Sequence, residues 1–289
     1  MLHANELPLR HVFNELDGGF GTSGPDSFKG PMGQRLAGDI HLESVVPFKE
    51  ILSKVKVISD SVQNDLSQDQ ELLYKYSRAV SSGTLASNLA KRKPGPPNHS
   101  RWLTLALRIL ILYTRTTNPD TQLIRLVTFV QQVYVVMWFD IKSNPKFTMG
   151  AIHLHRMMEL IMEQPEDVNK ICAKVVQNNA YISHQKNVLP AMLEDQDETI
   201  RRKAVNKIIE VRQQKVEKVM AKKAMGIRWF KPPSLVWNSP NYVNMFSWDT
   251  VDITEPAVTM KMTDDELLVA YLKPLNFPLY SCHSQSVER

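Results

Sequence analysis

The amino-acid sequence predicts a mainly α-helical protein, built as a helical bundle or as stacked helical hairpins, with a Gly-rich N-terminal loop and an irregular aromatic C-terminal arm. Apolar residues recur at helical spacing near the N-terminus and through most of residues 100–224. Seven of the eleven glycines fall between residues 18 and 38, and prolines interrupt the chain after residue 226. A length of 289 residues, 43% of them hydrophobic, suits one or two domains. We predict three regions, at residues 1–90, 98–225 and 226–289.

The first predicted helix covers residues 5–16. Its apolar face follows the helical spacing through Leu9, Val12, Phe13 and Leu16. Pro8 is expected in the first turn, where its missing N–H costs no hydrogen bond. Asp17, followed by two glycines, ends the helix.

Residues 18–38 are predicted to form a loop with no regular structure. Residues 19–24 match the letters of the nucleotide-binding pattern GxGxxG. That pattern holds a pyrophosphate only when a strand precedes it and a helix follows directly. Here a predicted helix precedes it and Pro25 follows, so a plain loop is the better interpretation.

A second helix begins at a capping box formed by Ser67 and Gln70 and ends at Gly83. The basic, proline-rich residues 91–97 then favour a linker and an internal boundary. Three basic residues beside prolines also suit a nuclear address, although a solvated linker is the commoner meaning of such a run.

Helices dominate after this linker. Pro119 and Pro165 are expected in first turns. Two apolar stretches contain polar residues, among them Arg108 and Arg125, and are predicted to be buried helices, not membrane spans. The predicted helices cover residues 100–116, 119–143, 148–162, 165–178, 187–193 and 198–224.

The region after residue 226 is predicted to be an extended arm packed over the helical body. Prolines break it up, and three of the five tryptophans lie in it, at Trp229, Trp237 and Trp248. A short helix over residues 263–273 closes the region, with Thr263 as its cap.

Residues with catalytic or metal-binding chemistry are sparse. His153 and His155 are two positions apart, so on a helix they point in different directions and cannot share a metal. Cys172 lies on an apolar helical face and is expected in the core. Cys282 is followed by His283, but no third partner can be assigned. We therefore expect no metal site and no cofactor, and two cysteines favour a reducing compartment over a disulfide framework.

The strongest electrostatic feature is residues 199–231, which contain eleven Lys and Arg against two Glu, a net charge of +9 in a chain of net charge +5. A helix with this bias can follow a phosphate backbone, although a solvated helix face is the commoner meaning of a charge run. The candidate nucleic-acid-binding residues of this segment are Arg201, Arg202, Lys203, Lys207, Arg212, Lys215, Lys222 and Lys223.

A second interpretation competes for part of this segment. Residues 188–204 resemble one HEAT-type helical hairpin, with an apolar first helix, an acidic turn and a second helix that opens with Ile200 and Arg201. Since about three such repeats are needed to bury a continuous core, the hairpin is expected but a whole solenoid is not.

Several blocks resemble transposase-derived proteins with an RNase H-like core of the hAT type. They include the His-Ala-Asn-Glu-Leu-Pro-Leu-Arg-His run at residues 3–11, together with residues 16–18, 30–33, 99–104 and 282–289. The resemblance implies an RNase H-like sheet interrupted by a helical insertion, with carboxylates that hold two divalent metals. It also implies that His3 matches the catalytic-region histidine of the family's C/D-x2-H signature, that Arg101 and Trp102 match an Arg-Trp motif that contacts nucleic acid, and that Glu288 is the closing carboxylate.

The other catalytic carboxylates of that family have no counterpart here, because they would precede Met1. We therefore expect a catalytically inactive, C-terminal portion of a transposase-derived protein that binds nucleic acid through its basic helix. The alternative is a HEAT-like helical scaffold for protein–protein interaction. The candidate partners are DNA, a protein or a second copy of the chain, and not a membrane. No secretory signal is recognisable, so we expect an intracellular protein, nuclear rather than cytoplasmic.

Overall fold

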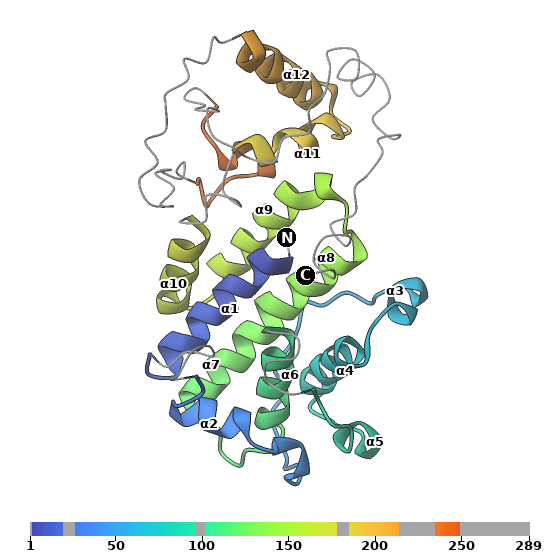
Figure 1. Cartoon of the computed structure of the whole chain (residues 1–289), viewed down its shortest axis with the longest axis vertical. Coiled ribbons are helices and arrows are strands. Elements are labelled where there is room, and N and C mark those ends of the chain that lie inside the picture. Colours follow the sequence, from blue (N-terminus) through green and yellow to red (C-terminus); the bar gives the residue numbers. More distant parts are fainter. Residues whose placement is uncertain (1, 20–26, 96–101, 178–184, 214–234, 249–289) are drawn as a thin grey trace. The chain divides into compact units, whose positions relative to one another are not determined.

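The structure is a computed structural model that describes residues 2–19, 27–95, 102–177, 185–213 and 235–248. It is mainly helical, as predicted, and the described residues contain no strand. The chain forms two compact units. The N-terminal unit comprises Leu2–Asn144 and Leu160–Val175, and the C-terminal unit comprises Pro145–Glu159 and the chain from Val176 onward (Figure 1).

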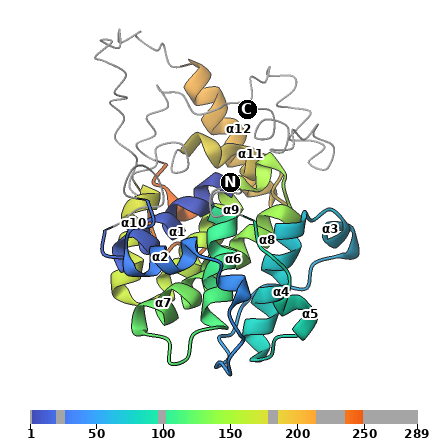
Figure 2. The same ribbon diagram turned by 60° about the horizontal axis from the view of Figure 1, so that its bottom comes forward.

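The N-terminal unit is assembled around α6 (Trp102–Tyr113), in which every residue from Leu103 to Tyr113 is buried. Helix α4 (Gln68–Ser82) packs on one side of α6, and α1, α2 and α7 lie on the other side (Figures 1 and 2). The unit also contains α1 (Leu2–Leu16), α2 (Pro31–Ala37), η1 (Ile40–Leu42), α3 (Asp60–Asn64), α5 (Ser87–Ala90), α7 (Thr121–Phe129), the π-helical segment η2 (Val130–Tyr134), α8 (Val135–Ser143) and most of α10 (Glu166–Gln177).

Helix α1 begins earlier than predicted, at Leu2, and this changes the position of Pro8. The proline lies inside the helix and not in its first turn, so that prediction is wrong. Proline inside a helix removes one backbone hydrogen bond at a cost of about 3 kcal/mol. The helix forms here because Leu9, Val12 and Phe13 are completely buried, as the spacing predicts.

Residues 31–37 form helix α2, although a loop was predicted over the whole of residues 18–38. The buried carboxylate of Asp17 accepts hydrogen bonds from the backbone N–H groups of Met32 (2.8 Å) and Gly33 (3.1 Å). At the other end, the buried Arg108 guanidinium donates to the carbonyl oxygens of Leu36 and Gly38, both at 2.8 Å. An anion at the N-terminus and a cation at the C-terminus both match the helix dipole.

The glycines around α2 make room for this carboxylate. A Cβ atom on Gly30 would lie 2.3 Å from the Asp17 Cγ, and one on Gly33 would lie 2.7 Å from its Oδ2. The local glycine density therefore reflects a close approach of Asp17 to the backbone.

Helix α4 has the predicted ends. Its capping box pairs Ser67 with Gln70, whose Oε1 accepts from the Ser67 N–H at 3.1 Å. Gly83 ends the helix with a φ of 68°, a left-handed conformation that suits glycine.

The predicted boundary at residues 91–97 falls inside the N-terminal unit, which runs without a break from Leu2 to Asn144. Arg92 forms an ion pair with Glu71 on α4 at 2.9 Å, and the Gly95 N–H donates to Asp69 at 3.1 Å. These contacts fix residues 91–95 to α4, which lies against α6. This linker therefore connects two helices of one unit.

Helices α7 and α8 are joined through η2 into a continuous helical stretch of 23 residues, which is long and apolar enough to span a membrane. Within the protein, 72% of its most apolar window is buried, so the predicted burial is confirmed. Pro119 precedes the N-cap Asp120, and Pro165 precedes the first residue of α10. Both prolines thus lie just outside the first turns predicted for them.

The C-terminal unit contains η3 (Phe147–Met149), most of α9 (Gly150–Met162), η4 (Gln185–Asn187), α11 (Leu189–Leu193), α12 (Glu198–Gln213) and η5 (Tyr242–Met245). Helix α9 continues into the N-terminal unit at Leu160. The predicted hairpin at residues 188–204 corresponds to α11 and the start of α12, which pack against each other.

Candidate functional site

The α11–α12 hairpin (residues 189–213) contains most of the described residues that were predicted to bind nucleic acid. Helix α11 buries Leu189, Ala191, Met192 and Leu193, and Ala204 of α12 is completely buried. The turn between the helices is acidic because its carboxylates satisfy backbone donors. Asp195 accepts from the Asp197 N–H at 2.9 Å, and Asp197 accepts from the Thr199 N–H at 2.8 Å.

Three side chains from other positions hold this acidic turn. The Thr148 hydroxyl donates to Glu194 at 2.7 Å, and the Tyr242 hydroxyl donates to the Asp195 carboxylate at 2.5 Å. The Arg201 guanidinium donates to two carbonyl oxygens of the turn, at Asp195 (2.7 Å) and Gln196 (2.8 Å). The turn is therefore fixed by polar contacts on both its side chains and its backbone.

Residues 235–248 form the described part of the predicted aromatic arm. They bury Leu235, Tyr242, Val243, Met245, Phe246 and Trp248. The Trp248 indole donates to the Val243 carbonyl at 2.8 Å, and the Gln185 amide donates to the Ser247 carbonyl at 2.7 Å. The rest of the predicted arm, including the helix over residues 263–273, lies outside the described residues.

Four of the predicted cations of α12 are engaged within the C-terminal unit. Arg202 forms an ion pair with Glu198 at 2.6 Å, and Lys207 forms one with Glu210 at 3.0 Å. The Lys203 ammonium lies 5.7 Å from the centroid of the Trp248 ring, which is cation–π geometry. Arg201 binds the turn, as described above, so its guanidinium has a structural role.

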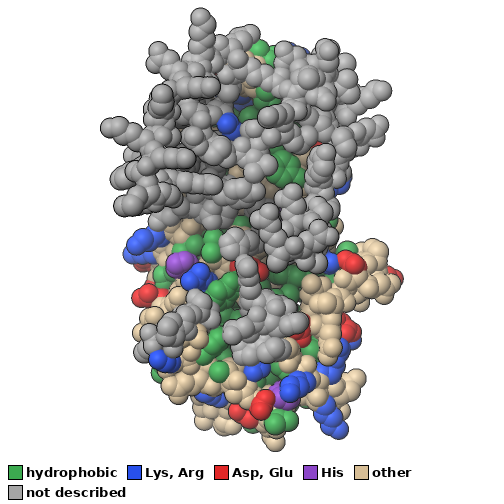
Figure 3. Space-filling model, viewed as in Figure 1, with side chains coloured by type: hydrophobic (Ala, Val, Ile, Leu, Met, Phe, Trp, Pro, Cys, Tyr) green, Lys and Arg blue, Asp and Glu red, His purple; other side chains and the backbone are tan. Residues whose placement is uncertain are grey.

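The hairpin has no net charge. Residues 189–213 contain five Lys and Arg and five Asp and Glu, so the acidic turn balances the basic helix. In Figure 3, basic and acidic side chains lie interspersed on the visible described surface in the lower part of the view, which belongs to the N-terminal unit. The excess of positive charge in residues 199–231 therefore comes mainly from the positions after Lys207.

Of the other predicted nucleic-acid-binding residues, one is described in the N-terminal unit and one in the hairpin. Trp102 begins α6 in the N-terminal unit, with the Arg10 guanidinium 5.7 Å from its ring centroid. Arg212 belongs to α12. Arg101, Lys215, Lys222 and Lys223 lie outside the described residues.

Of the two residues predicted for catalysis, only His3 lies among the described residues, in α1, and Glu288 lies outside them. Cys282 and His283, to which no third partner could be assigned, also lie outside the described part of the chain. Within that part, no group of three or more His, Cys, Asp or Glu side chains is placed to hold a metal ion. His155 contacts the Ser239 carbonyl at 2.9 Å through its Nε2.

The thiol of Cys172 is completely buried, as predicted, and this burial raises its pKa well above the ordinary range of a thiol. It therefore stays protonated as a core residue.

Tyr242 is a residue of this site that was not predicted from the sequence. Burial raises the pKa of its hydroxyl far above the usual range, and the Asp195 carboxylate raises it further. The hydroxyl therefore stays protonated and remains a donor. Tyr242 and Asp195 are 47 positions apart, so no local pattern indicates their contact.

Comparisons with models of protein families, with curated proteins and with solved structures found no match to this chain.

Proposed function

We propose that this protein is a non-catalytic helical scaffold that binds a partner protein. The observation that supports the proposal is the engagement of the hairpin cations. Arg201, Arg202 and Lys207 each bind an oxygen atom of the same hairpin, and Lys203 lies over an aromatic ring. A helix that binds a phosphate backbone needs basic side chains that can exchange their present partners for phosphate oxygens. A neutral, fixed hairpin is better suited to a protein partner.

A measurement of DNA binding by the full chain distinguishes this proposal from the alternative, in which the basic helix binds nucleic acid. Duplex DNA is titrated at low and at physiological salt, first with the unmodified chain and then with the triple variant Arg202→Gln, Lys203→Gln and Lys207→Gln. The proposal expects no DNA affinity that depends on these three positions. A salt-sensitive affinity that the triple variant abolishes would overturn the proposal.

Binding of a partner protein is tested by substituting an exposed apolar side chain of α12. Ile209 is 37% exposed on this helix, and Ile124 on α7 is 41% exposed and serves as a matched control. A partner protein recovered with the chain and then purified should bind it directly. Ile209→Asp should weaken that binding by at least about 1 kcal/mol, whereas Ile124→Asp should leave it unchanged.

DNA contact through residues 212–231 is a second candidate function. This stretch contains seven Lys and Arg against one Glu, a net charge of +6. If it binds DNA, the triple variant Lys215→Gln, Lys222→Gln and Lys223→Gln should lower the affinity and flatten its salt dependence. The triple variant at Arg202, Lys203 and Lys207 carries the same charge change and is the control.

The transposase resemblance and the nuclear location stay predictions. We propose that the chain is inactive in strand cleavage, since a single Glu288 cannot hold a metal pair. Incubation with supercoiled DNA and Mg²⁺ or Mn²⁺ should give no nicked product. Nicking that Glu288→Gln abolishes would contradict this proposal.

A further inference from the structure

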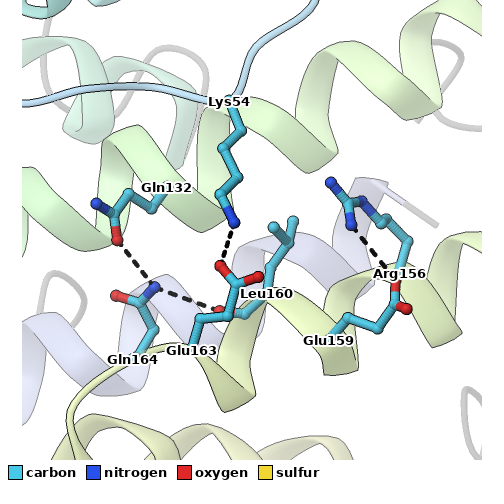
Figure 4. A network of polar contacts seen from close by, with 7 residues as sticks. All are labelled: Lys54, Gln132, Arg156, Glu159, Leu160, Glu163 and Gln164. Carbon is cyan, nitrogen blue, oxygen red and sulfur yellow. Dashed lines mark hydrogen bonds and ion pairs between the residues drawn. The ribbon is translucent and has the colours of Figure 1, made fainter.

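A long segment without helices, residues 44–59, crosses the helices of the N-terminal unit. Over residues 51–56 of this segment, burial alternates from one residue to the next. Ile51, Ser53 and Val55 are half-buried or buried, whereas Leu52, Lys54 and Lys56 are exposed. An alternation with a period of two is the mark of an extended, strand-like backbone. Figure 4 shows this segment crossing above the helices, with the Lys54 side chain directed at the carboxylate of Glu163.

The odd-numbered residues of this segment bind the helices through their main chain. The Ile51 N–H donates to the Val80 carbonyl at 3.1 Å, and the Ser53 N–H donates to the Ser81 hydroxyl at 3.0 Å. The Ile51 carbonyl accepts from the Gln131 amide at 3.2 Å, and the Lys49 carbonyl accepts from the Tyr113 hydroxyl at 2.8 Å. In an extended chain, the N–H and C=O groups of alternate residues point to the same side. On this edge, the main-chain groups of residues 49–53 named above are therefore satisfied by α4, α6 and η2, whereas the Ser53 and Val55 carbonyls make no hydrogen bond to the described residues.

The even-numbered residues present the opposite edge. The main-chain groups of Leu52, Lys54 and Lys56 make no hydrogen bond to any of the residues that the structure describes. Since an unpaired backbone group is costly to bury, these groups require water or a partner. The exposure of Leu52, at 66%, agrees with an open edge. Such an edge is the template for adding a further strand.

We propose that the main-chain edge of residues 52–56 binds an extended peptide segment of a partner protein by strand addition. The inference rests on the proposed scaffold function and names the surface that a partner uses.

The exposed side chains of the edge define the chemistry of this peptide. Leu52 offers an apolar contact, and Lys56 has no ion pair among the described residues. Lys54 is already paired with Glu163. An antiparallel peptide with an acidic residue opposite Lys56, and a large apolar residue four positions later opposite Leu52, matches both.

A second copy of this chain is the competing occupant of the same edge. Symmetric antiparallel pairing requires each residue to face a partner residue on the same side of the ladder. Registers centred on residues 54–56 place a lysine opposite a lysine and are disfavoured, whereas the register centred on Ser53 places Glu50 opposite Lys56. Protection of the even-numbered amides that rises with the concentration of the chain, without peptide, would show pairing of two copies and overturn the proposal.

Amide hydrogen exchange of the full chain tests the geometry. The probe is a short synthetic peptide of threonines with one aspartate and, four residues later, one valine; a scrambled peptide of the same composition is the control. Without peptide, the amides of Ile51 and Ser53 should exchange slowly, and those of Leu52, Lys54 and Lys56 should exchange fast. The aspartate–valine peptide should slow the three even-numbered amides only. Equal protection of odd and even amides before peptide addition would overturn the proposal, as would no protection at saturating peptide.

A charge exchange tests the assigned contact. Lys56→Glu should weaken binding of the aspartate peptide by about fivefold and strengthen binding of a peptide with lysine in place of aspartate by a similar factor. Lys49→Glu is the matched control, because Lys49 is an exposed lysine of the same segment whose carbonyl lies on the satisfied edge. Equal effects of the two variants would contradict the assignment.

The failure of this edge proposal can be distinguished from the failure of the proposed scaffold function. Partner binding that is lost in Ile209→Asp and kept in Lys56→Glu and Leu52→Asp would overturn the edge proposal and leave the scaffold proposal standing. Absence of any protein partner, with peptide protection intact, would overturn the scaffold proposal alone.

Discussion

The hydroxyl of Tyr242 donates a hydrogen bond of 2.5 Å to the carboxylate of Asp195, and so joins the aromatic segment to the acidic turn of the α11–α12 hairpin. Tyr242 is buried, and the only other described donor to that carboxylate is the backbone N–H of Asp197. The contact therefore links two parts of the C-terminal unit that are far apart in sequence.

Loss of this contact should lower stability. Tyr242→Phe should decrease the free energy of unfolding by about 1.5–3 kcal/mol, because a hydrogen bond to a charged group is removed. Urea unfolding monitored by circular dichroism measures the change. Tyr74→Phe is the control, since the Tyr74 hydroxyl has no hydrogen bond among the described residues and its removal should change stability little.

The close approach of Asp17 to α2 predicts different tolerance at two glycines. Gly33→Ala should destabilise the protein by about 1–3 kcal/mol, because the new Cβ would lie 2.7 Å from the Asp17 Oδ2 and 2.8 Å from the Phe28 Cα. Gly38→Ala should be nearly neutral, since its nearest atom is the Arg35 carbonyl oxygen at 3.4 Å. Thermal unfolding of both variants measures this difference, and equal melting temperatures would contradict the assigned contact.

The buried Asp17 carboxyl should make stability depend on pH. Burial raises the pKa of this carboxyl, and the hydrogen bonds from the Met32 and Gly33 N–H groups oppose that shift only in part. A raised pKa in the folded state contributes stability that is complete below the unfolded pKa and is lost as the pH rises through the folded pKa. The stability of the unmodified protein relative to Asp17→Asn should therefore fall as the pH rises from below the unfolded pKa of about 3.9 through the raised folded pKa. A relative stability that rises over this range would show that the hydrogen bonds dominate.

Glu71 should show the opposite pH dependence. Hydrogen bonds from Lys75 and Arg92 lower the pKa of its carboxyl. Its contribution is present above the unfolded pKa of about 4.3 and is lost as the pH falls through the lower folded pKa. Glu71→Gln should cost less than about 1 kcal/mol at neutral pH, because both ion pairs are partly exposed and screened by salt. Glu50→Gln, at an exposed carboxylate that forms no ion pair with the described residues, is the control and should change stability little at neutral pH.

Gln131 in the π-helical segment should be among the least replaceable polar residues of the N-terminal unit. Its amide donates to the carbonyl oxygens of Ser77 and Ile51 and accepts from the Ser77 hydroxyl at 2.5 Å. Gln131→Leu would leave these buried partners unsatisfied and should cost about 2–4 kcal/mol in unfolding free energy. Gln132→Leu should cost much less, since its side chain makes one contact, to Gln164 at 3.3 Å.

Local sequence patterns were sufficient to predict most helices, and insufficient where a distant residue supplies the partner. The capping box at Ser67 and the stop at Gly83 are local signals, and both are confirmed. Helix α2 escaped prediction because the acceptor for its first N–H groups is Asp17, which precedes the glycine-rich stretch. Nothing local in the sequence indicates that the helix after Pro119 adopts a π-helical turn at residues 130–134.

The same distinction applies to the candidate site. The pairs Arg202–Glu198 and Lys207–Glu210 follow i,i+4 and i,i+3 spacing, and they could have been anticipated from the sequence. A count of the basic residues alone does not reveal these ion pairs, because it ignores the acidic residues on the same face of the helix. The contact of Lys203 with Trp248 spans 45 positions and required the fold.

The π-helical segment Val130–Tyr134 acts as a register shift within one continuous helix. A π-helical turn holds one residue more than an α-helical turn, so the side chains that follow are rotated by about 100° from the direction that a regular helix would give them. The sequence positions that face the core in α8 are therefore offset by one residue from those that a regular continuation of α7 would give. Deleting one residue from this segment would restore regular α-helix and leave the core side chains Met137, Phe139 and Ile141 directed at their present neighbours. A homologue that is shorter by one residue at this point would therefore need no change in α8 to keep the same core.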